Sequence, residues 1–191
     1  MCEAGLAAIA YYYFDFRDEK KQTRNGLLSS LLSQLSADSN PFCDIVSRLR
    51  SSHAGGTRKP TDKALAKCLR DMLSLPGRGP VYIIVDAIDE CPNTTWTPSA
   101  REEVLELVQE LVDWHLPHVH LCLTSRPEFD IRVVLEPLTP LQISLHDEIG
   151  QKEDIIKYIN AVILSDKQMR KWRQEDKQLV IDDLSEKADG M

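Results

Sequence analysis

The stretch VYIIVDAIDE, at residues 81–90, decides the fold expected for this chain. Its first five residues are apolar without alternation, and the segment PGRGP at 76–80 precedes them. A short continuous apolar run bounded by turn residues predicts a parallel strand that is buried on both faces. The run ends in Asp86, Asp89 and Glu90, and doubly wound α/β proteins bind ligands beyond the carboxyl ends of such strands. We therefore expect a parallel α/β fold with an acidic site at this strand end.

The acidic cluster at the end of this strand allows two interpretations. Three carboxylates within five residues repel one another unless they share a cation. A buried strand that carries acid to the edge of a sheet is how P-loop NTPases hold Mg²⁺. The alternative is a strand that ends in a solvated acidic turn, and residues 81–90 alone leave both interpretations open.

Three further segments have the composition of strands. Residues 9–16 are aromatic and apolar, and residues 118–124 (HVHLCLT) and 141–145 (LQISL) are short apolar runs. Helical patterns separate these segments, among them a leucine stripe over residues 23–35. Strands that alternate with helices indicate a parallel sheet flanked by helices.

The helical patterns also suggest where the chain divides. Ser99 and Glu102 have the spacing of a capping box, which predicts the start of an amphipathic helix. From residue 151 onward the pattern is helical to the end of the chain. We expect an α/β core over residues 1–148 and the start of an all-helical subdomain over residues 149–191.

Composition and charge limit the class of protein. The chain has 191 residues, 42% of them hydrophobic, which suffices for one ordinary core. A net charge of -7 and a pI near 5.3 argue against nucleic acid or an anionic membrane as a partner. No apolar stretch approaches the ~18 residues of a membrane span. Five cysteines without a C-x-x-C pair indicate a reducing compartment, so we expect a cytoplasmic protein.

The acidic strand end resembles the Walker B motif of NACHT domains, which are signal-transducing ATPases of the STAND class of P-loop NTPases. In that family a small residue follows the metal-binding Asp, and an acidic pair comes two residues later. Asp86-Ala87-Ile88-Asp89-Glu90 matches this pattern at each position. The resemblance implies that Asp86 binds Mg²⁺ through water. It also implies that Asp89, with Glu90, positions and deprotonates the attacking water.

A second motif of the family follows the segment at 118–124. Thr124-Ser125-Arg126 resembles sensor 1, which implies that these residues contact the nucleotide and that Arg126 binds the γ-phosphate. A guanidinium suits this role because it makes planar, bidentate contacts to phosphate oxygens. The alternative for Arg126 is a surface salt bridge to Glu128 or Asp130.

Other phrases narrow the resemblance to one group of NACHT domains. The segments YYFDFR at 12–17, IDECP at 88–92 and ADGM at 188–191 resemble the nephrocystin-type N-terminal group of fungal NLR-like receptors with ankyrin or WD repeats. The group implies a nucleotide-dependent switch for innate-immunity or heterokaryon-incompatibility-like signalling. It further implies ATP or GTP with Mg²⁺ as cofactors, and protein partners or self-association.

The chain holds no G-x-x-x-x-G-K-[ST] sequence, which a P-loop requires. The resemblance therefore implies a partial NACHT module without its first strand and P-loop. The family's strand order, 5-1-4-3-2, would place that first strand between the segments at 141–145 and 118–124. We expect weak nucleotide binding or none from this chain alone, and we leave open whether it is an enzyme. The alternative function is a non-catalytic protein-interaction fragment.

Two weaker alternatives involve metals without the family. His118, His120 and Cys122 alternate along one strand and so share a face, although their spacing matches no familiar zinc pattern. More often such residues are polar groups of the core with hydrogen-bond partners. A metal-dependent phosphohydrolase that uses the carboxylates alone would need further acidic ligands on other strand ends, and residues 124–126 offer none.

Overall fold

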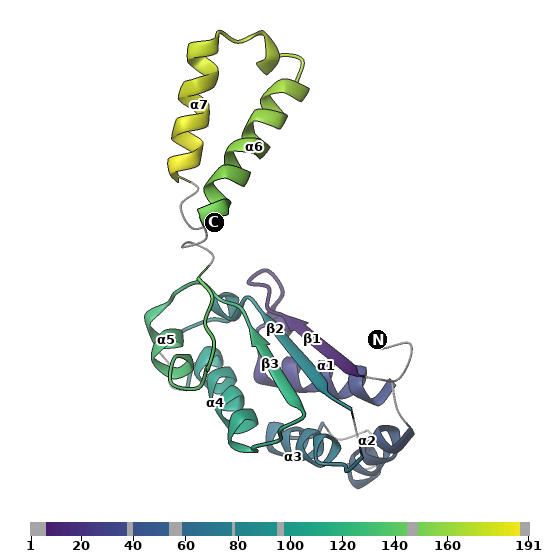
Figure 1. The fold of residues 1–191 in the computed structure, drawn as a ribbon. Helices are drawn as coiled ribbons and strands as arrows, with labels where there is room; N and C mark the ends of the chain where they lie inside the picture. The colour runs from purple at the N-terminus through teal and green to yellow at the C-terminus, as the bar shows by residue number, and fades with distance from the viewer. Residues whose placement is uncertain are drawn as a thin grey trace. The chain divides into compact units, whose positions relative to one another are not determined.

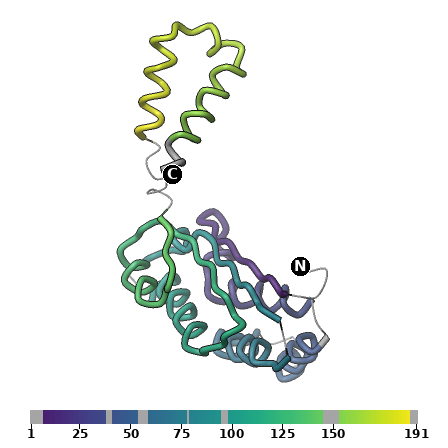
Figure 2. The backbone as a smooth tube through the Cα atoms, viewed as in Figure 1, coloured from purple at the N-terminus to yellow at the C-terminus, as the bar shows by residue number. Residues whose placement is uncertain are grey.

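The structure is a computed structural model, traced as a backbone tube in Figure 2. It describes residues 7–37, 40–53, 59–77, 79–94, 98–144 and 149–187. The chain divides into two compact units, Met1–Thr139 and Pro140–Met191. The first unit contains a sheet with its helices, and the second contains helices.

Three parallel strands in the order β1-β2-β3 form the sheet (Figure 1). They are β1 (Ala8–Tyr13), β2 (Val81–Asp86) and β3 (Val119–Leu123). The strands predicted at 9–16, 81–86 and 118–124 are thereby confirmed. The register aligns Tyr11 with Ile84 and Ile84 with Cys122, so the carboxyl ends of all three strands meet at one edge.

Helices fill both crossovers between the strands. The elements between β1 and β2 are η2 (Glu19–Lys21), α1 (Arg24–Ala37), α2 (Asn40–Ser52) and α3 (Asp62–Leu73). The elements after β2 are η4 (Ile88–Glu90), α4 (Ala100–Asp113) and, beyond β3, α5 (Phe129–Leu135). The predicted capping box at the start of α4 is confirmed, with Ser99 and Glu102 bonded to each other's backbone N–H. The mixed α/β fold with a parallel sheet is therefore established.

One continuous core lies between the sheet and its helices. The five leucines of the predicted stripe in α1 are all buried against it: Leu27, Leu28, Leu31, Leu32 and Leu35. Alternate residues of β2, at positions 81, 83 and 85, point into the same core. Buried apolar residues of α3 and α4 complete it.

The opposite face of the sheet is open among the described residues, so the prediction that β2 is buried on both faces is wrong. Ile83 is fully buried, whereas its neighbours Tyr82 and Ile84 are 41% and 36% exposed. The reason is topological. From β1 to β2 to β3 the chain steps in one direction, and right-handed crossovers then place every connecting helix on the same face (Figure 1).

The strand predicted at 141–145 is also wrong over the part that the structure describes. Residues 141–144 have no regular structure, and both Leu141 and Ile143 are exposed; residue 145 lies outside the described residues. An extended segment becomes a strand only when a neighbour accepts its backbone hydrogen bonds. Alternating apolar residues alone do not supply such a neighbour, so they do not fix this segment to the sheet.

The second unit is a pair of helices, α6 (Ile149–Ser165) and α7 (Gln174–Lys187), joined through η6 (Met169–Lys171). A small core of Ile159, Ile163 and Ile181 holds them together. Ile181 is the buried residue of α7 and Val180 packs against the same core, whereas Leu179 and Leu184 are exposed. Over the described part of the chain, none of the helices combines the length and apolarity that a membrane crossing requires.

Candidate functional site

The carboxyl ends of β2 and β3 are tied together by hydrogen bonds through one residue, Thr124. Its backbone N–H donates to the Val85 carbonyl and its own carbonyl accepts from the Ile88 N–H, each at 3.0 Å. Its side-chain oxygen accepts from the Ala87 N–H at 3.0 Å, and its hydroxyl donates to the Asp86 carboxylate. Thr124 therefore fixes the loop that follows β2 and orients Asp86 at the sheet edge.

Ala87 turns the chain sharply after Asp86. Its backbone lies in the left-handed region, with φ 56° and ψ 50°. Residues other than glycine rarely adopt this conformation, and a small side chain lowers its cost. Because of the turn, Ile88 is buried in the core and the next residue, Asp89, is directed along the sheet edge toward β3. A strained backbone of this kind is common at functional sites.

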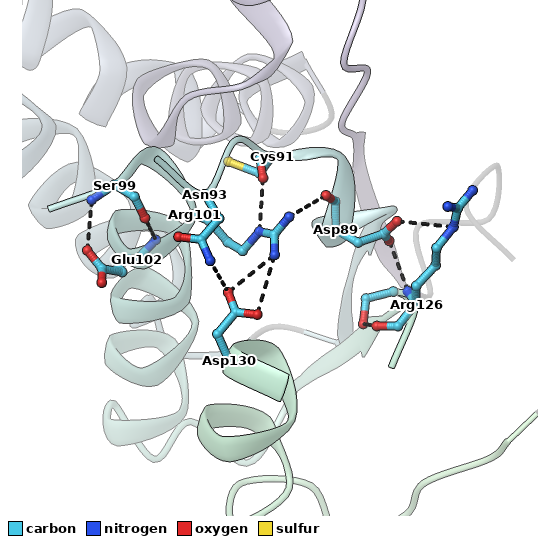
Figure 3. Close-up of polar contacts among 9 residues, drawn as sticks. Asp89, Cys91, Asn93, Ser99, Arg101, Glu102, Arg126 and Asp130 are labelled. Carbon is cyan, nitrogen blue, oxygen red and sulfur yellow. Dashed lines mark hydrogen bonds and ion pairs between the residues drawn. The ribbon is translucent and has the colours of Figure 1, made fainter. Parts of the chain in front are cut away.

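Asp89 and Arg126 form the main contact across the site (Figure 3). One carboxylate oxygen accepts from the Arg126 backbone N–H at 3.0 Å, and the other lies 3.5 Å from Arg126 Nε. The Asp89 side chain is 11% exposed and the Arg126 side chain is 73% exposed. The ion-pair partner of the Arg126 side chain is thus Asp89, and not Glu128 or Asp130 as in the alternative drawn from the sequence. The guanidinium remains accessible to a ligand.

The three carboxylates of the acidic cluster have three separate donors. Asp86 pairs with the Thr124 hydroxyl, Asp89 with Arg126, and Glu90 Oε2 accepts from the Phe16 N–H at 3.2 Å. Among the described residues, no group of three or more His, Cys, Asp or Glu side chains is arranged to hold a metal. Each carboxylate thus has its own hydrogen-bond donor, and these donors offset part of the repulsion expected from the spacing.

The remaining site candidates have local contacts. The Ser125 hydroxyl donates to the Arg126 carbonyl at 2.9 Å. His118 Nε2 lies 2.8 Å from the Leu73 carbonyl oxygen, while the ring of His120 stacks on Tyr82 with centroids 4.9 Å apart. The two histidines thus have different contacts in this structure.

Arg101, in the first turn of α4, donates hydrogen bonds to the backbone of the loop at residues 87–91, called the acidic loop below. This residue was not identified from the sequence. Its side chain is buried, with the residue 8% exposed. Nη2 donates to the Asp89 carbonyl at 2.6 Å, and Nε donates to the Cys91 carbonyl at 2.9 Å (Figure 3). One arginine thus holds the backbone on both sides of Glu90.

The same guanidinium connects this loop to α5. Arg101 Nη1 forms an ion pair with Asp130 at 3.2 Å, and Asn93 Nδ2 donates to the same carboxylate at 3.0 Å. A cation at the start of a helix opposes the helix dipole, so Arg101 needs a compensating partner. That unfavourable position, two residues after the cap at Ser99, is the sequence feature by which Arg101 could have been found.

A depression of about 400 Å³ lies beside the acidic loop. It is lined by Phe16, Gln22, Asp89, Glu90, Cys91, Pro92, Arg101, Arg126 and Glu128. Side chains of both charges therefore face it, and Asp86 is not among its lining residues. The depression extends the site from the Asp89–Arg126 pair toward the loop that follows β1.

The buried thiol of Cys91 gives the site a testable pH dependence. Burial raises its pKa from 9.0 to about 12. Between these values the unfolded chain loses a proton that the folded chain keeps, so the free energy of unfolding falls as pH rises. We expect Cys91→Ala to reduce this fall when urea unfolding is compared from about pH 8 to about pH 11. Cys43→Ala, which removes an exposed thiol from the same chain, is the matched control substitution. Equal slopes in wild type and Cys91→Ala would contradict the assignment.

Comparison with known proteins adds one finding to this geometry. The family model described as Nephrocystin 3, N-terminal, matches residues 2–126. No curated protein and no solved structure matches the chain. The matched range includes all three strands and the site residues from Asp86 to Arg126.

Proposed function

The chain belongs to the nephrocystin 3 N-terminal family, and from this membership and the geometry of the strand ends we propose that it forms part of a NACHT nucleotide-binding module. In this proposal the module is a cytoplasmic STAND-type switch of NLR-like signalling proteins that responds to ATP or GTP with Mg²⁺. The observation that carries it is the juxtaposition of two motifs. Asp86 at the end of β2 contacts Thr124, and Asp89 in the following loop contacts Arg126, at the carboxyl ends of β2 and β3.

The donor set at this edge fits Mg²⁺ only together with a nucleotide. Mg²⁺ in phosphate sites is bound through one or two carboxylates, with phosphate oxygens and water as the other ligands. Asp86 is exposed, and the Thr124 hydroxyl orients its carboxylate. It can therefore supply one ligand, directly or through water. Bound there, Mg²⁺ would neutralise charge on the phosphates.

Arg126 and Asp89 offer a way to detect the terminal phosphate. Their side chains lie 3.5 Å apart, and the guanidinium is largely exposed. A γ-phosphate carries more charge than a carboxylate and accepts the same planar contacts. We propose that it draws the Arg126 side chain away from Asp89. The freed carboxylate of Asp89, with Glu90 next to it, would then hold a water molecule for attack.

These 191 residues contain no P-loop sequence. The loop that binds the phosphates would therefore come from a different polypeptide segment. The backbone N–H groups and lysine of that loop supply most of the phosphate contacts in P-loop NTPases. We therefore expect Mg·ATP to bind this chain with a dissociation constant of about 1 mM or weaker. Hydrolysis would require the completed site.

Amide NMR spectra of the 191-residue chain titrated with Mg·ATP test this function, since shift changes detect millimolar binding. We expect shifts of the amides at residues 86–90 and 124–126 that depend on Mg²⁺ and disappear in Asp86→Ala. Asp113→Ala, at the other end of α4, is the matched control and keeps them. Shifts that are absent in wild type, or that persist in Asp86→Ala, would refute a nucleotide site at this edge.

A second candidate function is a non-catalytic interaction fragment of a degenerate NACHT protein. The open face of the sheet favours it, because Tyr11, Tyr82 and Ile84 are large apolar residues left exposed on one surface. Absence of any Mg²⁺-dependent shift in the titration above would favour this second function.

A further inference from the structure

One side chain closes the outer edge of β1. Gln34 Oε1 accepts from the Tyr11 N–H at 3.0 Å, and Gln34 Nε2 donates to the Tyr11 carbonyl at 2.6 Å. These are the two hydrogen bonds that a residue on a neighbouring strand would make. The amide of Gln34 thus takes the place of a fourth strand at one point of the sheet edge.

Tyr11 occupies the middle of this edge. The N–H groups of Ala8 and Phe14 donate to carbonyls at either end of β2, so alternate residues of β1 face the sheet interior. Ile9, Tyr11 and Tyr13 therefore direct their backbone groups outward. An incoming strand would bond these three in succession, and Gln34 blocks the central one.

Gln34 is held in position by its own helix. Its Nε2 also donates to Ser30 Oγ at 2.9 Å, one turn earlier in α1. Leu31 and Leu35, on the adjacent face of α1, are fully buried in the core. The helix backbone is thereby fixed beneath β1, and a single polar contact orients the amide toward the strand.

The segment that Gln34 covers has the composition of a strand that self-associates. Residues 8–14, AIAYYYF, contain no charge, no proline and no glycine. Uncharged segments rich in β-formers at an exposed sheet edge readily pair with another chain. With Tyr11 at the centre of the edge, two copies of β1 can pair antiparallel about a two-fold axis, which is a closed and symmetric arrangement.

We propose that the outer edge of β1 is a strand-addition surface for a second copy of this chain, and that the Gln34 amide keeps it closed. The surface is separate from the nucleotide site, because the hydrogen bonds of Gln34 join α1 to the middle of β1 and involve none of the residues assigned to that site. Displacement of Gln34 opens the edge, and the backbone groups of Ile9, Tyr11 and Tyr13 then bond to the partner strand.

Gln34→Met tests the proposal, because methionine keeps the length and helix propensity of glutamine but has no amide. In sedimentation velocity of the 191-residue chain, we expect this variant to associate more tightly than wild type. A change of about tenfold in the dimer dissociation constant corresponds to about 1.4 kcal/mol. Gln109→Met, the same exchange on α4 where the amide contacts only Asp113, is the matched control and leaves the association state unchanged.

A second substitution shows whether the association uses the edge. Proline at position 11 removes an outward N–H that donates only to Gln34, and proline is tolerated on edge strands in this orientation. We expect Gln34→Met combined with Tyr11→Pro to return to the association state of wild type. If Gln34→Met disturbs folding, as judged by near-ultraviolet circular dichroism, Ser30→Ala releases the amide more gently and should shift association in the same direction.

Two outcomes overturn the proposal. In the first, folded Gln34→Met, or folded Ser30→Ala in its place, associates no more than wild type. In the second, association increases but persists when Tyr11→Pro is added, which would assign it to another surface such as the open face of the sheet.

Discussion

Replacement of Arg101 by alanine is expected to lower the free energy of unfolding of the first unit by about 3 kcal/mol. The guanidinium is buried, and it bonds the carbonyls of Asp89 and Cys91 as well as the carboxylate of Asp130. Truncation leaves the two backbone carbonyls without this donor, while Asp130 keeps only the hydrogen bond from Asn93. Each unpaired buried acceptor costs about 1–3 kcal/mol, and the ion pair contributes less because Asp130 is partly exposed.

The matched control for this prediction is Arg132→Ala on α5. Arg132 forms an exposed pair with Glu136 at 2.7 Å, so its loss should change the free energy of unfolding by less than about 0.5 kcal/mol. Arg101→Lys keeps the charge but cannot reach both carbonyls and Asp130 with one ammonium, so it recovers only part of the loss. Urea unfolding measures the differences. Equal values for Arg101→Ala and Arg132→Ala would show that the guanidinium contributes nothing.

An effect on the site accompanies the loss of stability. Arg101 binds the backbone on both sides of Glu90, so its removal should loosen the acidic loop before the rest of the sheet. Hydrogen exchange of the Glu90 and Cys91 amides, which donate to the carbonyls of Ala87 and Ile88, reports this directly. We expect both amides to exchange faster in Arg101→Ala, while that of Trp114, at the far end of α4, does so only as far as global stability falls.

Elements with a local physical cause could be predicted from the sequence. The strand at 81–86 follows from an apolar run between turn residues, and the start of α4 follows from the spacing of Ser99 and Glu102. The α1 leucine stripe likewise predicts which residues are buried. In each case the interactions that decide the structure lie within one turn or one strand, so no distant contact is needed.

Features that depend on distant contacts could not be predicted in the same way. An apolar run such as residues 81–85 is compatible with burial on one face or on both, and only the direction of both crossovers decides between them. The segment at 141–145 alternates like a strand, but an alternating pattern does not specify a partner. Both predictions were wrong for the same reason: the sequence pattern of a segment does not specify which other elements lie next to it in the fold.

The candidate site shows the same division. Residue types and spacing indicated that the ends of β2 and β3 would meet, and Asp89 does contact Arg126. The individual partners were not predicted. Arg126 and Asp89 are 37 residues apart, and the donor to Glu90, the Phe16 N–H, is 74 residues from it. Such pairs follow from strand order and register, which the sequence motifs do not encode.

Two adjacent isoleucines of β2, Ile83 and Ile84, lie on opposite faces of the sheet, so substitutions at these positions test how far each face is buried. Ile83 is fully buried, and we expect Ile83→Ala to lower the free energy of unfolding by about 2–5 kcal/mol through lost burial and the cavity left behind. Ile84 is 36% exposed on the open face, and Ile84→Ala should lower the free energy of unfolding by about 1 kcal/mol or less.

The two substitutions remove the same atoms from the same strand, so the change in β-propensity cancels and the difference in urea unfolding reports burial alone. Equal large losses would mean that the outer face is covered in solution, either by another part of the polypeptide or by a second molecule; in the latter case the loss at Ile84 would diminish on dilution, while that at Ile83 would not.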